Sequence, residues 1–169
     1  NMTILVTGGA GFIGANFVLD WLAASDEPII NLDKLTYAGN LETLSSLQGS
    51  PNHIFAQGDI GDRTLVEHLL AEHKPRAVIN FAAESHVDRS IHGPAEFVTT
   101  NIVGTFNLLE CAREYWNGLD DSAKKAFRFH HVSTDEVYGD LPLDSEEKFT
   151  EEYPFSPSSP YSASKAAAD

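Results

Sequence analysis

The chain has 169 residues, of which 42% are hydrophobic and 10% aromatic, as is ordinary for one domain with a sizeable core. Its formal net charge is −14 and its basic residues are scattered, so we expect no nucleic-acid partner. Cys111 is the only cysteine, which excludes an intrachain disulfide and fits a reducing cytoplasm. The first apolar stretch, residues 4–6, is too short to span a membrane, so we expect a soluble cytoplasmic protein without membrane contact.

Apolar runs of strand length alternate along the chain with runs in which apolar residues recur at three and four positions. This alternation predicts an α/β fold with a parallel sheet. The predicted strands cover residues 3–7, 28–33, 53–57, 76–82 and 128–134. The predicted helices cover residues 12–24, 62–73 and 94–116, with a short one within 35–48 and another beginning near Tyr161. The proline-rich, acidic segment 138–160 is predicted to be a long surface loop.

A glycine-rich segment joins the first predicted strand to the first predicted helix. Side chains here would block the tight turn, the approach of the backbone to a pyrophosphate, or the packing of helix on strand. The spacing fits Gly-x-Gly-x-x-Gly from Gly9 and also Gly-x-x-Gly-x-x-Gly, a form typical of short-chain dehydrogenases. A turn without a ligand is the alternative. The position after a strand instead favours a doubly wound, Rossmann-type domain that binds a dinucleotide through Gly8, Gly11, Phe12, Ile13 and Gly14.

Asp33 ends the second predicted strand, about 20 residues beyond the glycines, where a carboxylate binds the adenosine ribose hydroxyls. Its charge would repel the extra phosphate of NADP, so we expect NAD. The neighbouring Lys34 leaves open how strict this choice is.

Tyr161 and Lys165 lie four residues apart on the last predicted helix and therefore share a face. A nearby ammonium and a cationic nicotinamide would favour the phenolate of Tyr161, lowering its pKa enough to make it a base near neutral pH. This pair alone is common on helix surfaces. Its position after the glycine motif and five strands makes it specific.

Thr134, Asp135 and Glu136 follow the fifth predicted strand, at the carboxyl edge where doubly wound sheets bind ligands. One alternative is a solvated acidic turn closed by a local side-chain bond. A dehydrogenase needs only the hydroxyl of Thr134 beside Tyr161. Asp135 and Glu136 therefore offer an additional acid and base.

Five segments together resemble the dTDP-glucose 4,6-dehydratases of the extended short-chain dehydrogenase family. They are residues 7–14, 35–40, 83–91, 133–139 and 161–165. The pair Asp135 and Glu136 discriminates most. Similar epimerases and decarboxylases would not be expected to carry it, and GDP-mannose dehydratases usually lack the aspartate.

The resemblance implies a reaction in which NAD oxidises C-4 of dTDP-glucose, water is lost across C-5 and C-6, and hydride returns to C-6. The product is the 4-keto-6-deoxy sugar nucleotide. Tyr161, helped by Thr134 and Lys165, would take the proton of the 4-hydroxyl. Glu136 would remove the C-5 proton as general base, and Asp135 would protonate the departing 6-hydroxyl as general acid.

The resemblance also implies further binding residues. Those for the cofactor are Lys34, Thr36, Asp59, Ile60, Ala82 and Ala83, together with Tyr161 and Lys165. Ser85, His86 and Thr134 would face the nucleotide-sugar substrate, although His86 alternatively is a structural loop residue. His130 and His131 point to opposite faces of a strand, so no metal is predicted.

Residue 169 interrupts the last predicted helix without a capping glycine, asparagine or proline. We therefore expect residues 1–169 to be an incomplete NAD-binding domain without its substrate domain, and to be inactive alone. The resemblance implies a homodimer, whose interface would use the helix that begins at Tyr161 and the stripe Phe97, Asn101, Gly104, Leu108 and Cys111. A sugar-nucleotide 4-epimerase and a non-catalytic NAD-binding fragment are the alternatives.

Overall fold

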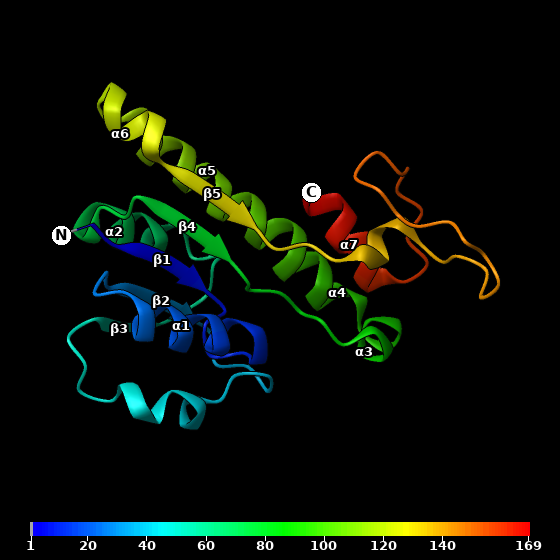
Figure 1. The fold of residues 1–169 in the computed structure, drawn as a ribbon, viewed down its shortest axis with the longest axis horizontal. Coiled ribbons are helices and arrows are strands. Elements are labelled where there is room, and N and C mark those ends of the chain that lie inside the picture. Colours follow the sequence, from blue (N-terminus) through cyan, green and yellow to red (C-terminus); the bar gives the residue numbers. More distant parts are fainter. Residues whose placement is uncertain (1) are drawn as a thin grey trace. The chain divides into compact units, whose positions relative to one another are not determined.

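A computed structural model describes residues 2–169, which divide into two units (Figure 1). Unit 1 comprises residues up to Ala82 and Gly104–Val132, and unit 2 comprises Ala83–Val103 and Ser133–Asp169. None of the helices in the described residues is both long and apolar enough to cross a membrane.

Unit 1 contains a parallel sheet of five strands in the order β3-β2-β1-β4-β5 (Figure 1). The strands are β1 (Ile4–Thr7), β2 (Ile29–Asp33), β3 (His53–Gln57), β4 (Ala77–Asn80) and β5 (Arg128–His131). All five were predicted. The largest difference is that β5 ends at His131 instead of Thr134, because Thr134 serves as the N-cap of the next helical turn.

Helices cover both faces of this sheet. They are α1 (Phe12–Ala24), the 3-10 helix η1 (Leu41–Leu47), α2 (Arg63–His73) and α5 (Thr105–Asn117). The unpredicted short α6 (Asp121–Ala126) precedes β5 and buries none of its residues. On one face Val18 of α1 packs in a cluster with Ile4 of β1. On the other, Leu108 of α5 packs in a cluster with Leu5 of β1. The doubly wound Rossmann-type architecture is therefore confirmed.

Unit 2 consists of short helical elements and a loop. The elements are α3 (Val87–His92), α4 (Pro94–Phe97), most of the π-helical turn η2 (Val98–Gly104), the 3-10 turn η3 (Asp135–Tyr138) and α7 (Pro160–Ala168). A capping box starts α7, since Ser159 Oγ accepts a hydrogen bond from Ser162 N at 3.0 Å. Residues 139–159 contain no helix or strand, which confirms the predicted loop.

The helix predicted over residues 94–116 is divided into α4, η2 and α5. Its stripe is not free to meet a second subunit. Leu108 and Cys111 are 0% and 1% exposed in the core of unit 1, while Phe97 meets the ring of Tyr161 edge-on within unit 2. The expectation that this stripe forms an interface was wrong, because the chain's own packing uses it.

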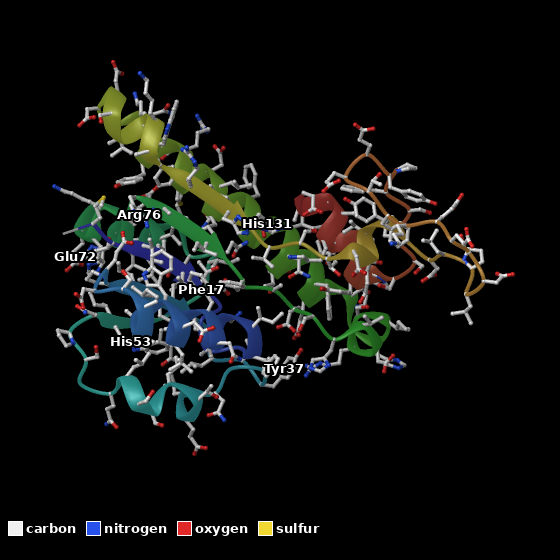
Figure 2. All side chains as sticks on the ribbon, in the orientation of Figure 1. Phe17, Tyr37, His53, Glu72, Arg76 and His131 are labelled. Atoms are coloured by element: carbon white, nitrogen blue, oxygen red, sulfur yellow. The ribbon has the colours of Figure 1, made fainter. Side chains whose placement is uncertain are left out.

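An ion pair joins the residue before β4 to the loop after α1 in unit 1 (Arg76 is labelled in Figure 2). Arg76 Nε and Nη2 donate to the two carboxylate oxygens of Glu27 at 2.6 and 2.8 Å. The Glu27 side chain is only 14% exposed, and the guanidinium lies 5.9 Å from the ring centre of Trp21. Such a two-bond, partly buried pair stabilises more than an exposed pair does.

We expect Glu27→Gln to lower the free energy of unfolding by about 1.5–3 kcal/mol, the usual worth of hydrogen bonds to charged groups. Urea denaturation followed by circular dichroism measures the change. The matched control is Glu67→Gln, which removes an exposed pair with Arg63 on α2. Equal midpoints for the two variants would show that the partly buried pair contributes no more than the exposed one.

Candidate active site

Three glycines of the loop between β1 and α1 are required by the packing of unit 1 itself. Gly8 has a φ of +71°, and a Cβ on it would lie 2.6 Å from Ala82 N. A Cβ on Gly14 would overlap the carbonyl oxygen of Gly8, and one on Gly9 would overlap the side chain of Asn31. Larger residues at these positions would therefore disturb the loop with or without a ligand.

Gly11 is different, because its immediate surroundings do not require a glycine. A Cβ on it would have one neighbour within 4 Å, the carbonyl oxygen of Gly8 at 3.4 Å, which is ordinary contact. Gly11 is the N-cap of α1, where no side chain of the described residues caps the helix. Phe12 and Ile13 follow it and are 85% and 64% exposed. This open helix N-terminus fits the close approach of a pyrophosphate.

Asp33 lies at the end of β2 and is 8% exposed. Its Oδ2 accepts a hydrogen bond from Ala10 N, inside the glycine loop, and its Oδ1 accepts one from Leu35 N, both at 2.8 Å. A carboxylate has about four acceptor positions, so two remain for ribose hydroxyls. The structure therefore fixes Asp33 against the loop without using up its acceptors.

Five other predicted cofactor residues lie in unit 1, namely Lys34, Thr36, Asp59, Ile60 and Ala82. Lys34 Nζ is 2.7 Å from Asp59 Oδ2. Burial raises the pKa of Asp59. Hydrogen bonds from Lys34 and the Gly61 amide together lower it by more than burial raises it, so the net pKa is below its usual value. Thr36 closes a turn by accepting a hydrogen bond from Gly39 N.

Ile60 and Ala82 are held by unit 1 itself. The Ile60 side chain is 4% exposed and belongs to the core, and its carbonyl accepts a hydrogen bond from Asn107 at 2.6 Å. Ala82 N donates to Thr7 Oγ1 at 3.3 Å. Ile60 therefore has a structural role that sequence reasoning missed.

In unit 2, the hydroxyl of Tyr161 is hydrogen-bonded to the side chain of Thr134. Burial raises the pKa of Tyr161 above its usual value, the hydrogen bond with Thr134 lowers it, and the charges of Glu136 and Asp135 raise it further. The net pKa is raised. The expected phenolate is therefore not favoured by the chain's own residues, because burial and two carboxylates prevail. Four of the five predicted catalytic residues, Thr134, Asp135, Glu136 and Tyr161, nevertheless lie near enough to interact.

Lys165 lies one turn beyond Tyr161 on α7 and is 4% exposed. Burial lowers the pKa of its ammonium, and the charge of Asp169 raises it in part. Asp169 Oδ2 also accepts a hydrogen bond from Ser133 Oγ at 2.5 Å, next to Thr134 in the chain.

Asn101, in η2, ties the segment after Ala83 to α7. Its amide nitrogen donates to Glu84 O and Ser164 Oγ, and its oxygen accepts from Glu84 N, each at 2.9 Å. Ser85 and His86, predicted to face the substrate, are exposed beside this buried bridge. Sequence reasoning gave Asn101 no role of its own. The sequence offered one signal for this role, because Asn101 is an amide side chain within a stripe of mainly apolar residues.

The predicted site residues are thus distributed over both units. Unit 1 holds Gly8, Gly11, Phe12, Ile13, Gly14, Asp33, Lys34, Thr36, Asp59, Ile60 and Ala82, and unit 2 holds Ala83, Ser85, His86, Thr134, Asp135, Glu136, Tyr161 and Lys165. Across residues 2–169, no three His, Cys, Asp or Glu side chains gather as a metal site would require.

Comparisons with known proteins identify relatives that match nearly the whole chain. A dTDP-glucose 4,6-dehydratase of Xanthomonas campestris pv. campestris (strain B100) is 63% identical over 167 residues, which are 99% of this chain and 47% of that protein. The crystal structure of dTDP-glucose 4,6-dehydratase from Bacillus anthracis in complex with NAD matches with a TM-score of 0.83 and 44% identity. It is covered over 48% of its chain, and this chain over 99%.

A UDP-glucose 4-epimerase of Thermus thermophilus in complex with NAD is more distant, at 35% identity and a TM-score of 0.81, over 99% of this chain and 48% of that one. The chain spans about half the length of the curated relatives it matches. The family model described as GDP-mannose 4,6 dehydratase matches residues 5–169. The chain therefore belongs to the GDP-mannose 4,6-dehydratase family, and within it is similar to dTDP-glucose 4,6-dehydratases.

Proposed function

We propose that the chain supplies the cofactor-binding and acid–base residues of an enzyme that dehydrates dTDP-glucose to dTDP-4-keto-6-deoxyglucose. The observation that carries the proposal is the hydrogen bond between Tyr161 and Thr134, with Asp135 and Glu136 near enough to raise the pKa of the phenol. The similarity to dTDP-glucose 4,6-dehydratases supports it. Residues 1–169 span about half of those enzymes, so we expect them to be inactive alone.

Each acid–base group has a separate task. NAD, when bound, supplies the redox chemistry by accepting hydride from C-4 and returning it to C-6. Tyr161 takes the proton of the 4-hydroxyl, with Thr134 hydrogen-bonded to it and Lys165 one turn away. The resulting 4-keto group acidifies the C-5 proton, which Glu136 removes. Asp135 protonates the 6-hydroxyl as it leaves as water.

The two carboxylates favour dehydration over the alternatives. A 4-epimerase of similar fold needs to oxidise and reduce C-4 only, so it has no use for a second acid and base. A non-catalytic NAD-binding module would need neither these carboxylates nor a lysine that is 4% exposed. A buried ammonium is costly and is kept where chemistry needs it.

The cofactor is NAD in this proposal. The open N-terminus of α1 at Gly11 receives the pyrophosphate, and Asp33 accepts hydrogen bonds from the adenosine ribose. Because Asp33 is a carboxylate, NADP would bring its phosphate against a like charge. Asp59 pairs with Lys34 at 2.7 Å, which reduces the attraction of Lys34 for that phosphate.

We propose a homodimer for the complete enzyme, through an apolar face of α5 that the stripe prediction overlooked. Phe106 and Leu109 lie three residues apart on α5 and are 63% and 40% exposed. An apolar stripe on an exposed helix commonly marks a subunit interface.

The buried thiol of Cys111 supports a cytoplasmic location. Burial raises the pKa of this thiol above its usual value, which keeps it unreactive. No other cysteine is present to pair with it, as suits a reducing compartment. Cell fractionation tests this location, and recovery of the protein in the periplasm or outside the cell would contradict it.

The role of Gly11 can be tested on the chain itself. We expect Gly11→Ala to weaken NAD binding at least ~10-fold while leaving the unfolding midpoint nearly unchanged, because the added Cβ enters the space of the ligand and not that of the fold. The matched control is Gly118→Ala at the end of α5, where a Cβ has nearly the same clearance, 3.5 Å from Tyr115 O. Isothermal titration with NAD and urea denaturation are the two measurements.

Titration of the unmodified chain with NADP tests Asp33 in the same series, and we expect weaker binding than with NAD. Undiminished NAD binding by Gly11→Ala would show that the pyrophosphate does not bind at the N-terminus of α1. Equal binding of NAD and NADP by the unmodified chain would show that Asp33 does not select between them.

For assembly, we expect Phe106→Glu to convert the dimer of the complete enzyme largely to monomer, since it places a charge in an apolar contact. The complete enzyme is obtained by joining residues 1–169 to the second half of the Xanthomonas relative. Light scattering gives the mass, and His68→Glu on the exposed surface of α2 is the control. An unchanged dimer in Phe106→Glu would refute this interface.

The chemistry is tested in the same joined enzyme. We expect Glu136→Gln to retain oxidation at C-4, because Tyr161, Thr134 and Lys165 remain, while elimination slows by about 10²–10⁴-fold, the usual worth of a general base. Reduced cofactor should then accumulate and be visible by its absorbance in single turnovers with dTDP-glucose. Tyr161→Phe should instead suppress the formation of reduced cofactor.

UDP-glucose and GDP-mannose serve as substrate controls, and product analysis identifies the 4-keto sugar. If Glu136→Gln turned over at the unmodified rate and its C-5 proton still exchanged, Glu136 would not be the general base. It would then be only a residue of a solvated acidic turn. A 4-epimerised sugar from the unmodified enzyme would favour the epimerase alternative.

A further inference from the structure

A cluster of four aromatic rings lies immediately beyond the Asp135–Glu136 pair in unit 2. Tyr138, the last residue of η3, stacks on Phe149 with ring centres 5.4 Å apart. It meets Tyr153 and Phe155 edge-on, at 6.2 and 5.5 Å. Phe149 and Tyr153 also contact each other at 5.0 Å. One ring of the catalytic turn is thus held by three rings of the loop.

The backbone makes the same connection. Ser156 N donates to Val137 O at 2.9 Å, so the returning end of the loop is bonded to η3 itself. Gly139 has a φ of +86°, and a Cβ on it would lie 2.5 Å from Ser156 O. A glycine after Tyr138 is therefore needed for this close approach.

The turn that carries the two carboxylates has little to hold it in place by itself. It is one 3-10 turn, a conformation with poor hydrogen-bond geometry. Its closing bonds are long, from Glu136 N to Thr134 Oγ1 and from Gly139 N to Glu136 O at 3.2 Å, and from Val137 N to Thr134 O at 3.4 Å. Val137 is its only residue that is buried. The contacts of Tyr138 are thus a main constraint on where Asp135 and Glu136 lie.

Charge opposes this arrangement, so an apolar attachment is needed. Between residues 140 and 152 the loop carries six acidic residues and one lysine. Their charges repel one another and also repel the carboxylates of Asp135 and Glu136. The ring contacts act against this repulsion between the loop and η3.

We propose that Tyr138 is a positioning residue for elimination, and that its packing on Phe149, Tyr153 and Phe155 holds Asp135 and Glu136 where they exchange protons with C-5 and the 6-hydroxyl. This inference rests on the proposed function. It separates the two chemical steps, because Tyr161, Thr134 and Lys165 perform oxidation at C-4 and are not part of the ring cluster.

In the joined enzyme we expect Tyr138→Leu to slow elimination by about 10–100-fold, since an error of about 1 Å in a catalytic group costs up to about 10²-fold. Oxidation at C-4 should continue, so reduced cofactor accumulates in single turnovers with dTDP-glucose. Tyr138→Phe keeps the ring and should restore elimination. Leu143→Ala is the matched control, because Leu143 lies in the same loop, is fully exposed and is outside the cluster.

Phe149→Leu removes the stacked partner from the loop side and leaves the sequence of η3 unchanged. It should show the same accumulation of reduced cofactor, which protects the test against a misfolded Tyr138→Leu. Equal loss of oxidation and elimination in both variants would indicate a merely structural role and overturn the proposal. Elimination at the unmodified rate in both would overturn it as well.

Backbone relaxation by NMR on residues 1–169 tests the ordering without any turnover. We expect the order parameter of the Glu136 amide to fall from about 0.85 to below about 0.6 in Tyr138→Leu, and to stay unchanged in Leu143→Ala. An unchanged value in Tyr138→Leu would overturn the positioning role. Absence of turnover in the unmodified joined enzyme would instead count against the proposed function, so the two failures are distinguishable.

Discussion

The central strands of the sheet in unit 1 are buried on both faces, and this constraint sets the rest of the unit. Every residue of β1 and β2 is buried, so the helices that follow each strand must cross to cover the faces. Polar side chains inside such a sheet need partners. Thr7 Oγ1 donates to Asn80 Oδ1 at 2.5 Å, and the Asn80 amide lies 3.1 Å from His131 Nδ1. These three residues form one row of the register, across β1, β4 and β5 (Figure 2 labels His131).

This polar row also fixes the place where β4 leaves the sheet. Thr7 Oγ1 accepts a hydrogen bond from Ala82 N, and the backbone of Ala82 is what a Cβ on Gly8 would meet. The same row therefore holds the strand end and the first glycine of the loop. The geometry at the carboxyl edge thus follows from burial deeper in the sheet, and the glycine loop is held without a side-chain cap on α1.

Unit 2 is ordered by different means. Its elements α3, α4 and η3 have six, four and four residues, too few to be stable alone. The Asn101 amide joins the segment at Glu84 to α7, and the ring of Tyr138 joins η3 to the loop. Specific polar and aromatic contacts thus replace the continuous apolar core that orders unit 1.

This contrast explains which features the sequence could predict. The strands of unit 1 and its helices α1, α2 and α5 follow from apolar periodicity, and the roles of Gly8 and Gly14 follow from steric exclusion. The local sequence pattern does not predict the π-helical turn. The turn accompanies hydrogen bonds of Asn101 with Glu84 and Ser164, which are 17 and 63 positions away in the chain. The burial of Ile60, Leu108 and Cys111 in the core of unit 1 likewise depends on packing between distant segments.

The charges on α7 show that this helix is not built for stability alone. The pKa of Lys165 is lowered by burial, so the folded state holds its proton less firmly than the unfolded state does. Below the unfolded pKa the buried ammonium therefore costs stability, and that cost disappears only as pH rises past it. Tyr161 is neutral in both states near pH 7, so its raised pKa offsets none of this cost. Asp169 reduces the cost, yet an alanine like those at 166–168 would avoid it. A buried cation one turn from a phenol that two carboxylates influence fits the acid–base role proposed for these residues, since local rules are most often broken at functional sites.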